Sequence, residues 1–174
     1  MIKRSIMVIA LIIACTAAPA AEKKISMALS IGAFMPVDST TRDQFGGTWT
    51  RVALRSFERQ KPTEWRFISE IGNYTANGDS SVSLTPITIG AQRGFGDNPD
   101  VQPYVTLRGG PYFGRVEDPL GAVDNNTGLN VNAAFGVTFK RQFYVEIRYD
   151  YFSRFSGLNF DGISLSAGVR LFDL

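Results

Sequence analysis

The sequence predicts an all-β fold, an eight-stranded antiparallel up-and-down β-barrel that spans a membrane, and three observations predict it. Apolar and polar residues alternate with a period of two in repeated segments, as in strands with two different faces. These segments run for about ten residues, the length of a tilted membrane-spanning strand. No stretch of helix length shows a period of 3.6, so we expect eight strands and no helix.

Four segments show the alternation clearly. In residues 143–152, for example, Glu146 and Arg148 alternate with apolar neighbours. In the last of the four, the alternation places Phe172 on the same face as Arg170. The clear segments are 25–35, 129–140, 143–152 and 163–172.

Four further strands are predicted from a weaker alternation. The third of them contains Pro86, which has no N–H to donate to a strand ladder and so weakens that prediction. The weaker segments are approximately 48–58, 64–74, 82–93 and 103–113.

The connections between these strands are expected to alternate in length. Each odd-numbered connection is expected to be longer than the one that follows it, as in membrane barrels with short periplasmic turns and longer outer loops. An even number of strands then puts both chain termini on the periplasmic side. The two longest connections, 36–47 and 114–128, are expected to be exposed loops that meet the outside.

Residues 1–20 have the basic, apolar and small-residue parts of a secretory signal peptide, with a cleavage motif at Ala20. The apolar part is too short for a membrane helix. A lipoprotein signal, in which Cys15 would become the lipidated N-terminus, is the alternative. Either route exports the chain, and the barrel domain is expected to occupy residues 21–174.

The composition excludes several kinds of chemistry. The chain has no histidine, which removes His-dependent triads and His-ligated metal sites. Its one cysteine lies in the leader, so no disulfide is expected within the mature chain. Removing the leader also removes Lys3 and Arg4, which balances the basic and acidic residues and argues against nucleic-acid binding. We expect no cofactor and no metal.

The polar face indicates which side of the barrel points inward. It is rich in Gly, Ser and Thr with few charges, and the narrow interior of an eight-stranded barrel can hold only small residues and paired charges. The apolar face should then meet lipid. The polar network expected inside the barrel comprises Arg51, Arg55, Arg66, Glu70, Arg108, Glu146, Arg148, Asp150 and Arg170.

Two alternatives use the same strands differently. A soluble periplasmic, lipocalin-like barrel would turn its apolar face inward around an apolar ligand. A barrel enzyme acting on lipid or peptide would need reactive side chains, and Glu146 and Asp150 share one face. At four residues apart on a strand they lie about 13 Å from each other, too far for an acid/base pair. Ion pairs with arginine are the preferred interpretation, and we expect no enzyme.

Aromatic residues near the strand ends suggest two belts at the two membrane interfaces, although aromatics also simply favour strands. The expected belts are Trp65, Phe139 and Phe143 beside the short turns, and Trp49, Tyr74, Tyr112, Tyr149 and Tyr151 beside the long loops.

The leader, the period-two strands, the loop alternation and the closing segment 158–172 together resemble the small eight-stranded outer-membrane barrels of Gram-negative bacteria. The resemblance covers essentially the whole mature chain. It implies residence in the outer membrane, contact with its lipid, recognition by the outer-membrane assembly machinery and a structural or surface-interaction role. Members usually end in an aromatic residue, whereas here Phe172 is followed by Asp173 and Leu174. The sequence identifies no extracellular partner.

Overall fold

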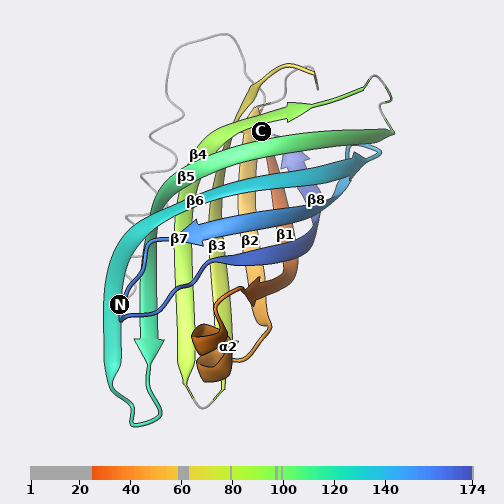
Figure 1. Cartoon of the computed structure of the whole chain (residues 1–174). Coiled ribbons are helices and arrows are strands. Elements are labelled where there is room, and N and C mark those ends of the chain that lie inside the picture. Colours follow the sequence, from red (N-terminus) through yellow and green to blue (C-terminus); the bar gives the residue numbers. More distant parts are fainter. Residues whose placement is uncertain (1–24, 59–62, 79, 97, 99, 174) are drawn as a thin grey trace.

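The chain folds into one closed barrel in which each strand pairs with its neighbours in sequence and the last strand pairs with the first (Figure 1). The structure is a computed structural model and describes residues 25–58, 63–78, 80–96, 98 and 100–173. The expected processing sites Ala20 and Cys15 lie outside the described residues. The strands are β1 (Ile25–Pro36), β2 (Trp49–Glu58), β3 (Arg66–Asn77), β4 (Ser81–Gly94), β5 (Val101–Glu117), β6 (Val123–Phe139), β7 (Phe143–Phe152) and β8 (Gly162–Asp173), and the helix is α2 (Ser39–Phe45).

All eight neighbouring pairs are antiparallel, which confirms the predicted eight-stranded up-and-down barrel. Two ends of the barrel are distinguished below. The terminal end is where β1 begins and β8 ends, together with the connections after β2, β4 and β6. The loop end carries α2 and the connections after β3, β5 and β7.

The expectation of no helix was wrong, because the connection after β1 contains the short helix α2. Asp38 caps it: its carboxylate accepts hydrogen bonds from the backbone N–H and the hydroxyl of Thr41, at 2.9 and 3.2 Å. Seven residues are two turns, too few to display a helical period in the sequence. No helix among the described residues is long and apolar enough to cross a membrane.

Two expectations about the connections were also wrong. The connection after β3, residues 78–80, is shorter than the one after β4, residues 95–100, because β3 and β4 pair as far as Asn77 and Ser81. Residues 114–128 are mostly strand, and the loop shrinks to residues 118–122. There the Asp118 carboxylate accepts hydrogen bonds from the backbone N–H groups of Leu120 and Ala122. β5 and β6 therefore form one long hairpin.

A β-bulge near the end of β8 reverses the face of Phe172. Met27 of β1 pairs with Phe172, and the next residue, Ala28, pairs with Arg170, so Leu171 is the extra residue. One extra residue turns every later side chain of the strand to the opposite face. Leu171 and Phe172 are both about half exposed on the exterior, whereas the sequence pattern had placed Phe172 beside Arg170.

Pro86 lies inside β4 and is accommodated by a gap in the ladder. In the β3–β4 ladder, Ile71 pairs with Ile87 and Tyr74 pairs with Leu84. The pairing is interrupted between these two pairs. A proline has no N–H to donate there, and a closed barrel has no edge strand to receive it. The amide of Asn73 instead donates to the hydroxyl of Thr85 at 3.1 Å.

The barrel turns its apolar face outward. Ile31, Leu107 and Ile147 are 63, 61 and 52% exposed. In β7, the residues that alternate with Ile147 are buried. A soluble barrel with an apolar ligand cavity requires the opposite arrangement, so that alternative is wrong. The exterior is suited to hydrocarbon and the interior to polar side chains.

The interior near the loop end is filled by an aromatic cluster, and this corrects part of the belt prediction. Trp49, Tyr74 and Tyr112 are buried inside, because the alternation that turns Arg51 inward also turns Trp49 inward. Trp65, Phe139, Phe143, Tyr149 and Tyr151 lie on the exterior as expected. The aromatic cluster comprises Phe34, Phe45, Trp49, Tyr74, Tyr112, Phe152, Phe155 and Phe160.

Gly136 gives one prediction about this interior packing. It faces Tyr104 across the β5–β6 pair, and a Cβ at position 136 would clash with the ring and hydroxyl of Tyr104. We expect Gly136→Ala to lower the free energy of unfolding by about 1–3 kcal/mol, the usual cost of overpacking. Urea titration of the folded band on an unheated gel measures it. Gly109→Ala is the control, because its Cβ would come no closer than 3.7 Å to other atoms; equal losses in the two variants would contradict the prediction.

Candidate functional site

The middle of the barrel holds a buried ion-pair network centred on Glu70 of β3. One carboxylate oxygen of Glu70 accepts from Arg51 and Arg148, both at 2.6 Å. The other accepts from Arg55 at 3.0 Å and Arg108 at 2.6 Å. Four guanidinium groups from β2, β5 and β7 thus surround one carboxylate that is almost fully buried.

Glu146 of β7 is the second centre of the network. It accepts from Arg55 at 2.8 Å, from Arg148 at 2.6 Å and from Arg108 at 3.3 Å. The hydroxyl of Tyr104 donates to its other oxygen at 3.0 Å. Three arginines therefore bridge Glu70 and Glu146. The negative charges of the two carboxylates offset the positive charges of these arginines, which are buried away from water.

Asp150 lies at the edge of the network toward the loop end. Its Oδ2 accepts from the hydroxyl of Tyr74 at 3.0 Å, and Tyr74 in turn accepts from Arg51 Nε at 3.0 Å. On the other side, Arg108 Nε donates to Asn132 at 2.9 Å. These neutral groups extend the network without adding charge. The hydrogen bonds that they accept help to offset the burial of four arginines beside only three carboxylates.

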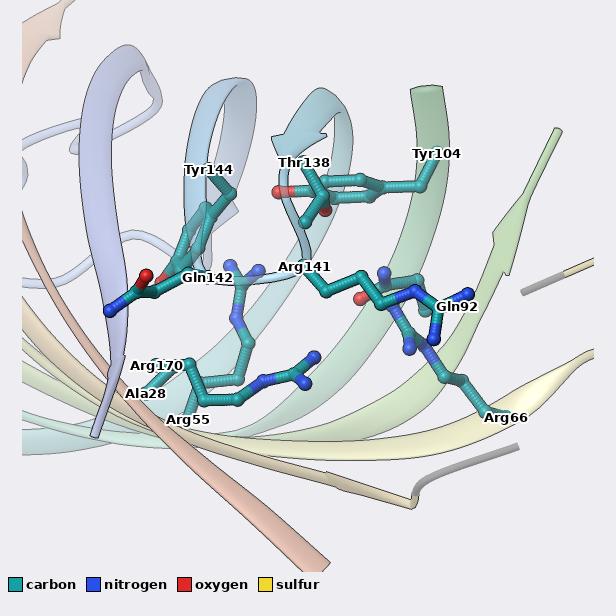
Figure 2. A pocket seen from close by; sticks show the side chains of 10 residues that line it. All are labelled: Ala28, Arg55, Arg66, Gln92, Tyr104, Thr138, Arg141, Gln142, Tyr144 and Arg170. Carbon is teal, nitrogen blue, oxygen red and sulfur yellow. The ribbon is translucent and has the colours of Figure 1, made fainter. Parts of the chain in front are cut away.

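Two of the predicted interior residues, Arg66 and Arg170, lie nearer the terminal end of the barrel. They line a small cavity at the terminal end together with Arg141 of the turn after β6 (Figure 2). Arg55 forms a link, because it lines the same cavity and also binds Glu70 and Glu146. The expected polar face therefore comprises the ion-pair network at the centre of the barrel and an arginine-lined cavity at the terminal end.

Sequence reasoning missed the tyrosines of the network. Tyr74 was assigned to an outer belt, and Tyr104 was not singled out. The spacing along the strand is the signal that finds them, because residues an even number of positions apart point to the same face. Tyr74 shares its face with Glu70, and Tyr104 shares its face with Arg108.

The carboxylates of the network are enclosed by other protein groups. Both oxygens of Glu146 are occupied by arginines and a tyrosine, and Glu146 is fully buried. Neither Glu146 nor Asp150 is among the residues that line the cavity at the terminal end. The chemistry available to these carboxylates is the neutralisation of neighbouring cations.

The closed antiparallel barrel, its apolar exterior and its ion-paired interior define the class, an eight-stranded membrane-type β-barrel. No protein-family model and no curated protein matches the sequence. The fold is similar to that of Neisserial surface protein A, with a TM-score of 0.65 and 16% identity over 88% of this chain and 100% of that one.

Two further solved structures share the fold. Ail, the attachment invasion locus protein of Yersinia pestis, matches with a TM-score of 0.52 and 15% identity over 87% of this chain and 100% of that one. The outer-membrane enzyme PagL matches with a TM-score of 0.57 and 15% identity over 84% of this chain and 99% of that one. At such identities the likeness concerns architecture alone, and the same barrel carries both surface proteins and an enzyme.

Proposed function

We propose that this protein is an integral outer-membrane barrel with a structural or surface-interaction role, its terminal end facing the periplasm and its loop end facing outward. The apolar exterior around a filled polar interior is the observation that carries the proposal. Outer-membrane lipid is then the partner of the exterior. The exposed, aromatic Phe172 on β8 supports recognition of the last strand by the assembly machinery.

The proposed role of the buried charges is structural. Arg51, Arg55, Arg108 and Arg148 are held by carboxylates from β3 and β7, so the network ties opposite sides of the barrel together. The aromatic cluster fills the interior beyond it. A barrel filled in this way is suited to a rigid support and not to a wide pore.

We propose further that the protein is not an enzyme. Both oxygens of Glu146 accept hydrogen bonds and Asp150 is fully buried, which supports this view. PagL has the same fold and is an enzyme, so this proposal rests on the buried carboxylates and not on the fold.

The loop end offers a braced surface and one projecting element. The hydroxyl of Thr41 in α2 donates to the carbonyl of Asn159 at 2.7 Å, so the connections after β1 and β7 are joined. The β5–β6 hairpin lies at the same end (Figure 1), and residues 123–127 are exposed on both faces of its strand. Leu120 at its turn is 94% exposed. This hairpin is the element that we propose meets an extracellular partner.

An epitope tag inserted between Leu120 and Gly121 tests the orientation. We expect antibody to label the tag on intact cells, because the turn would lie outside the membrane. A matched tag between Lys140 and Arg141, at the opposite end, should be labelled only after the outer membrane is permeabilised. The reverse pattern would show that the barrel is inserted the other way. If neither tag is labelled on intact cells and the protein is recovered as a soluble periplasmic protein, membrane insertion is refuted.

A further inference from the structure

The terminal end of the barrel contains a basic mouth pocket built by side chains from several strands. Arg66 reaches it from β3, Arg170 from β8 and Arg141 from the turn after β6, and all three extend into the same space (Figure 2). The rest of its lining consists of Ala28, Arg55, Gln92, Tyr104, Thr138, Gln142 and Tyr144. Guanidinium, amide and hydroxyl groups dominate this lining, and all of these can donate hydrogen bonds.

The turn that carries Arg141 adopts an unfavourable backbone conformation. Lys140 and Arg141 have φ angles of 47° and 58°, in the left-handed region that glycine and asparagine favour. The turn is nevertheless fixed from both sides. Lys140 N–H donates to the carbonyl of Asp100 at 2.8 Å, and Arg170 N–H donates to the carbonyl of Gln142 at 2.8 Å. A long cationic side chain is thus held over the mouth at a position where Asn-Gly would be less strained, and such strain clusters at ligand sites.

A second backbone irregularity lies beside Arg170. The bulge at Leu171 follows it directly, and bulges at barrel rims re-aim neighbouring side chains. Two of the four arginines that line the mouth pocket, Arg141 and Arg170, therefore lie at local departures from regular strand geometry.

Tyr144 supplies an independent observation. It is 7% exposed and lines the pocket, and its hydroxyl has no hydrogen-bond partner among the described residues. Its ring lies under the Arg55 guanidinium, at 4.8 Å from the ring centroid. A buried hydroxyl is normally hydrogen-bonded, and an acceptor oxygen entering the pocket would satisfy this one.

We propose that the mouth pocket binds a phosphate-class oxyanion from the periplasmic side. Planar guanidinium groups match the geometry of oxyanions and bind them through paired hydrogen bonds. Two sources supply this chemistry at the inner face of the membrane, free phosphate and the headgroups of anionic phospholipids. The inference goes beyond the surface role proposed above, and anion binding can be measured whichever way the barrel is inserted.

The test uses inorganic phosphate and the full barrel in a zwitterionic detergent. Isothermal titration calorimetry at constant ionic strength, with chloride as the reference anion, should show saturable phosphate binding to the unmodified protein. Arg141→Gly removes a donor and places glycine where φ is positive. We expect it to weaken phosphate binding by about 10-fold or more, the effect of losing one charge-assisted hydrogen bond. Its unfolding temperature without phosphate should be unchanged or higher.

Arg93→Gln is the matched control. Arg93 lies at the same end but faces outward, over the ring of Trp65 at 5.9 Å, so its loss should leave phosphate affinity unchanged. Equal weakening in the two variants would overturn the proposal, because it would indicate general attraction to positive charge. Absence of saturable binding relative to chloride would also overturn it.

Nanodiscs distinguish the two sources. If phospholipid headgroups occupy the pocket, phosphate affinity should be lower in phosphatidylglycerol nanodiscs than in phosphatidylcholine nanodiscs, and this difference should disappear in Arg141→Gly. If free phosphate is the ligand, the unmodified protein should bind it equally in both lipids. Either result supports an oxyanion site in the mouth pocket.

Discussion

Replacing Glu70 by glutamine should lower the free energy of unfolding by about 3–5 kcal/mol, the cost of removing one partner from a buried ion pair. Glu70 accepts hydrogen bonds from four arginines. The amide keeps the shape of the side chain but removes its charge. The arginines would then remain buried with Glu146 and Asp150 as the nearby carboxylates, and burying uncompensated charge is expensive.

Urea titration of the folded, heat-sensitive band measures this loss. Glu117→Gln is the control, because Glu117 pairs with Arg115 at 2.9 Å on the exposed hairpin, where both side chains are at least 40% exposed. An exposed pair contributes about 0–1 kcal/mol, so the control should differ little from the unmodified protein. If both variants lose the same small amount, the network does not stabilise the barrel.

A lysine at position 147 should prevent or strongly weaken insertion of the barrel. Ile147 lies midway along β7, and its cross-strand neighbours Phe135 and Leu165 are also about half exposed. A lysine on the lipid face near the bilayer midplane costs about 2–4 kcal/mol. We therefore expect Ile147→Lys to reduce the folded fraction in vesicles and the amount of protein in the outer-membrane fraction.

The matched control places the same charge outside the membrane. Val123 is 44% exposed and pairs with Glu117 beside the turn of the hairpin, and Val123→Lys should fold and fractionate normally. If Ile147→Lys also inserts normally, the exterior of β7 does not face hydrocarbon and the proposed membrane orientation is refuted.

The period-two pattern predicted the strands well where both faces are constrained. Strand β7 has the predicted bounds, because every outward residue is apolar or aromatic and the inward residues Glu146, Arg148 and Asp150 are charged. Prediction failed near the loop end, where β5 and β6 extend beyond the predicted strands. The start of β6, residues 123–127, is exposed on both faces, so no alternation marks it as strand. The bulge at Leu171 left no sequence signal either, because Leu171 and Phe172 are both apolar.

The candidate site was partly accessible to the same reasoning. Alternation can assign Glu70 and Arg148 to one face, but it cannot pair them, since they lie 78 residues apart in the chain. Pairing depends on the stagger of strands around the closed barrel, which is a property of the whole sheet. The cavity at the terminal end depends further on a strained turn and a bulge, which are tertiary features.

The location of the arginines constrains the order in which the barrel can form. Arg51 and Arg55 enter with the second strand, whereas Glu146 arrives with the seventh. A partly inserted sheet of the early strands would have Glu70 alone to neutralise these cations, and its inner face would lack the later strands that shield it from hydrocarbon. Such a sheet is a poor intermediate in lipid, since unpaired charge there is costly. Contacts of high sequence separation must form together, so we expect closure to be late, slow and cooperative.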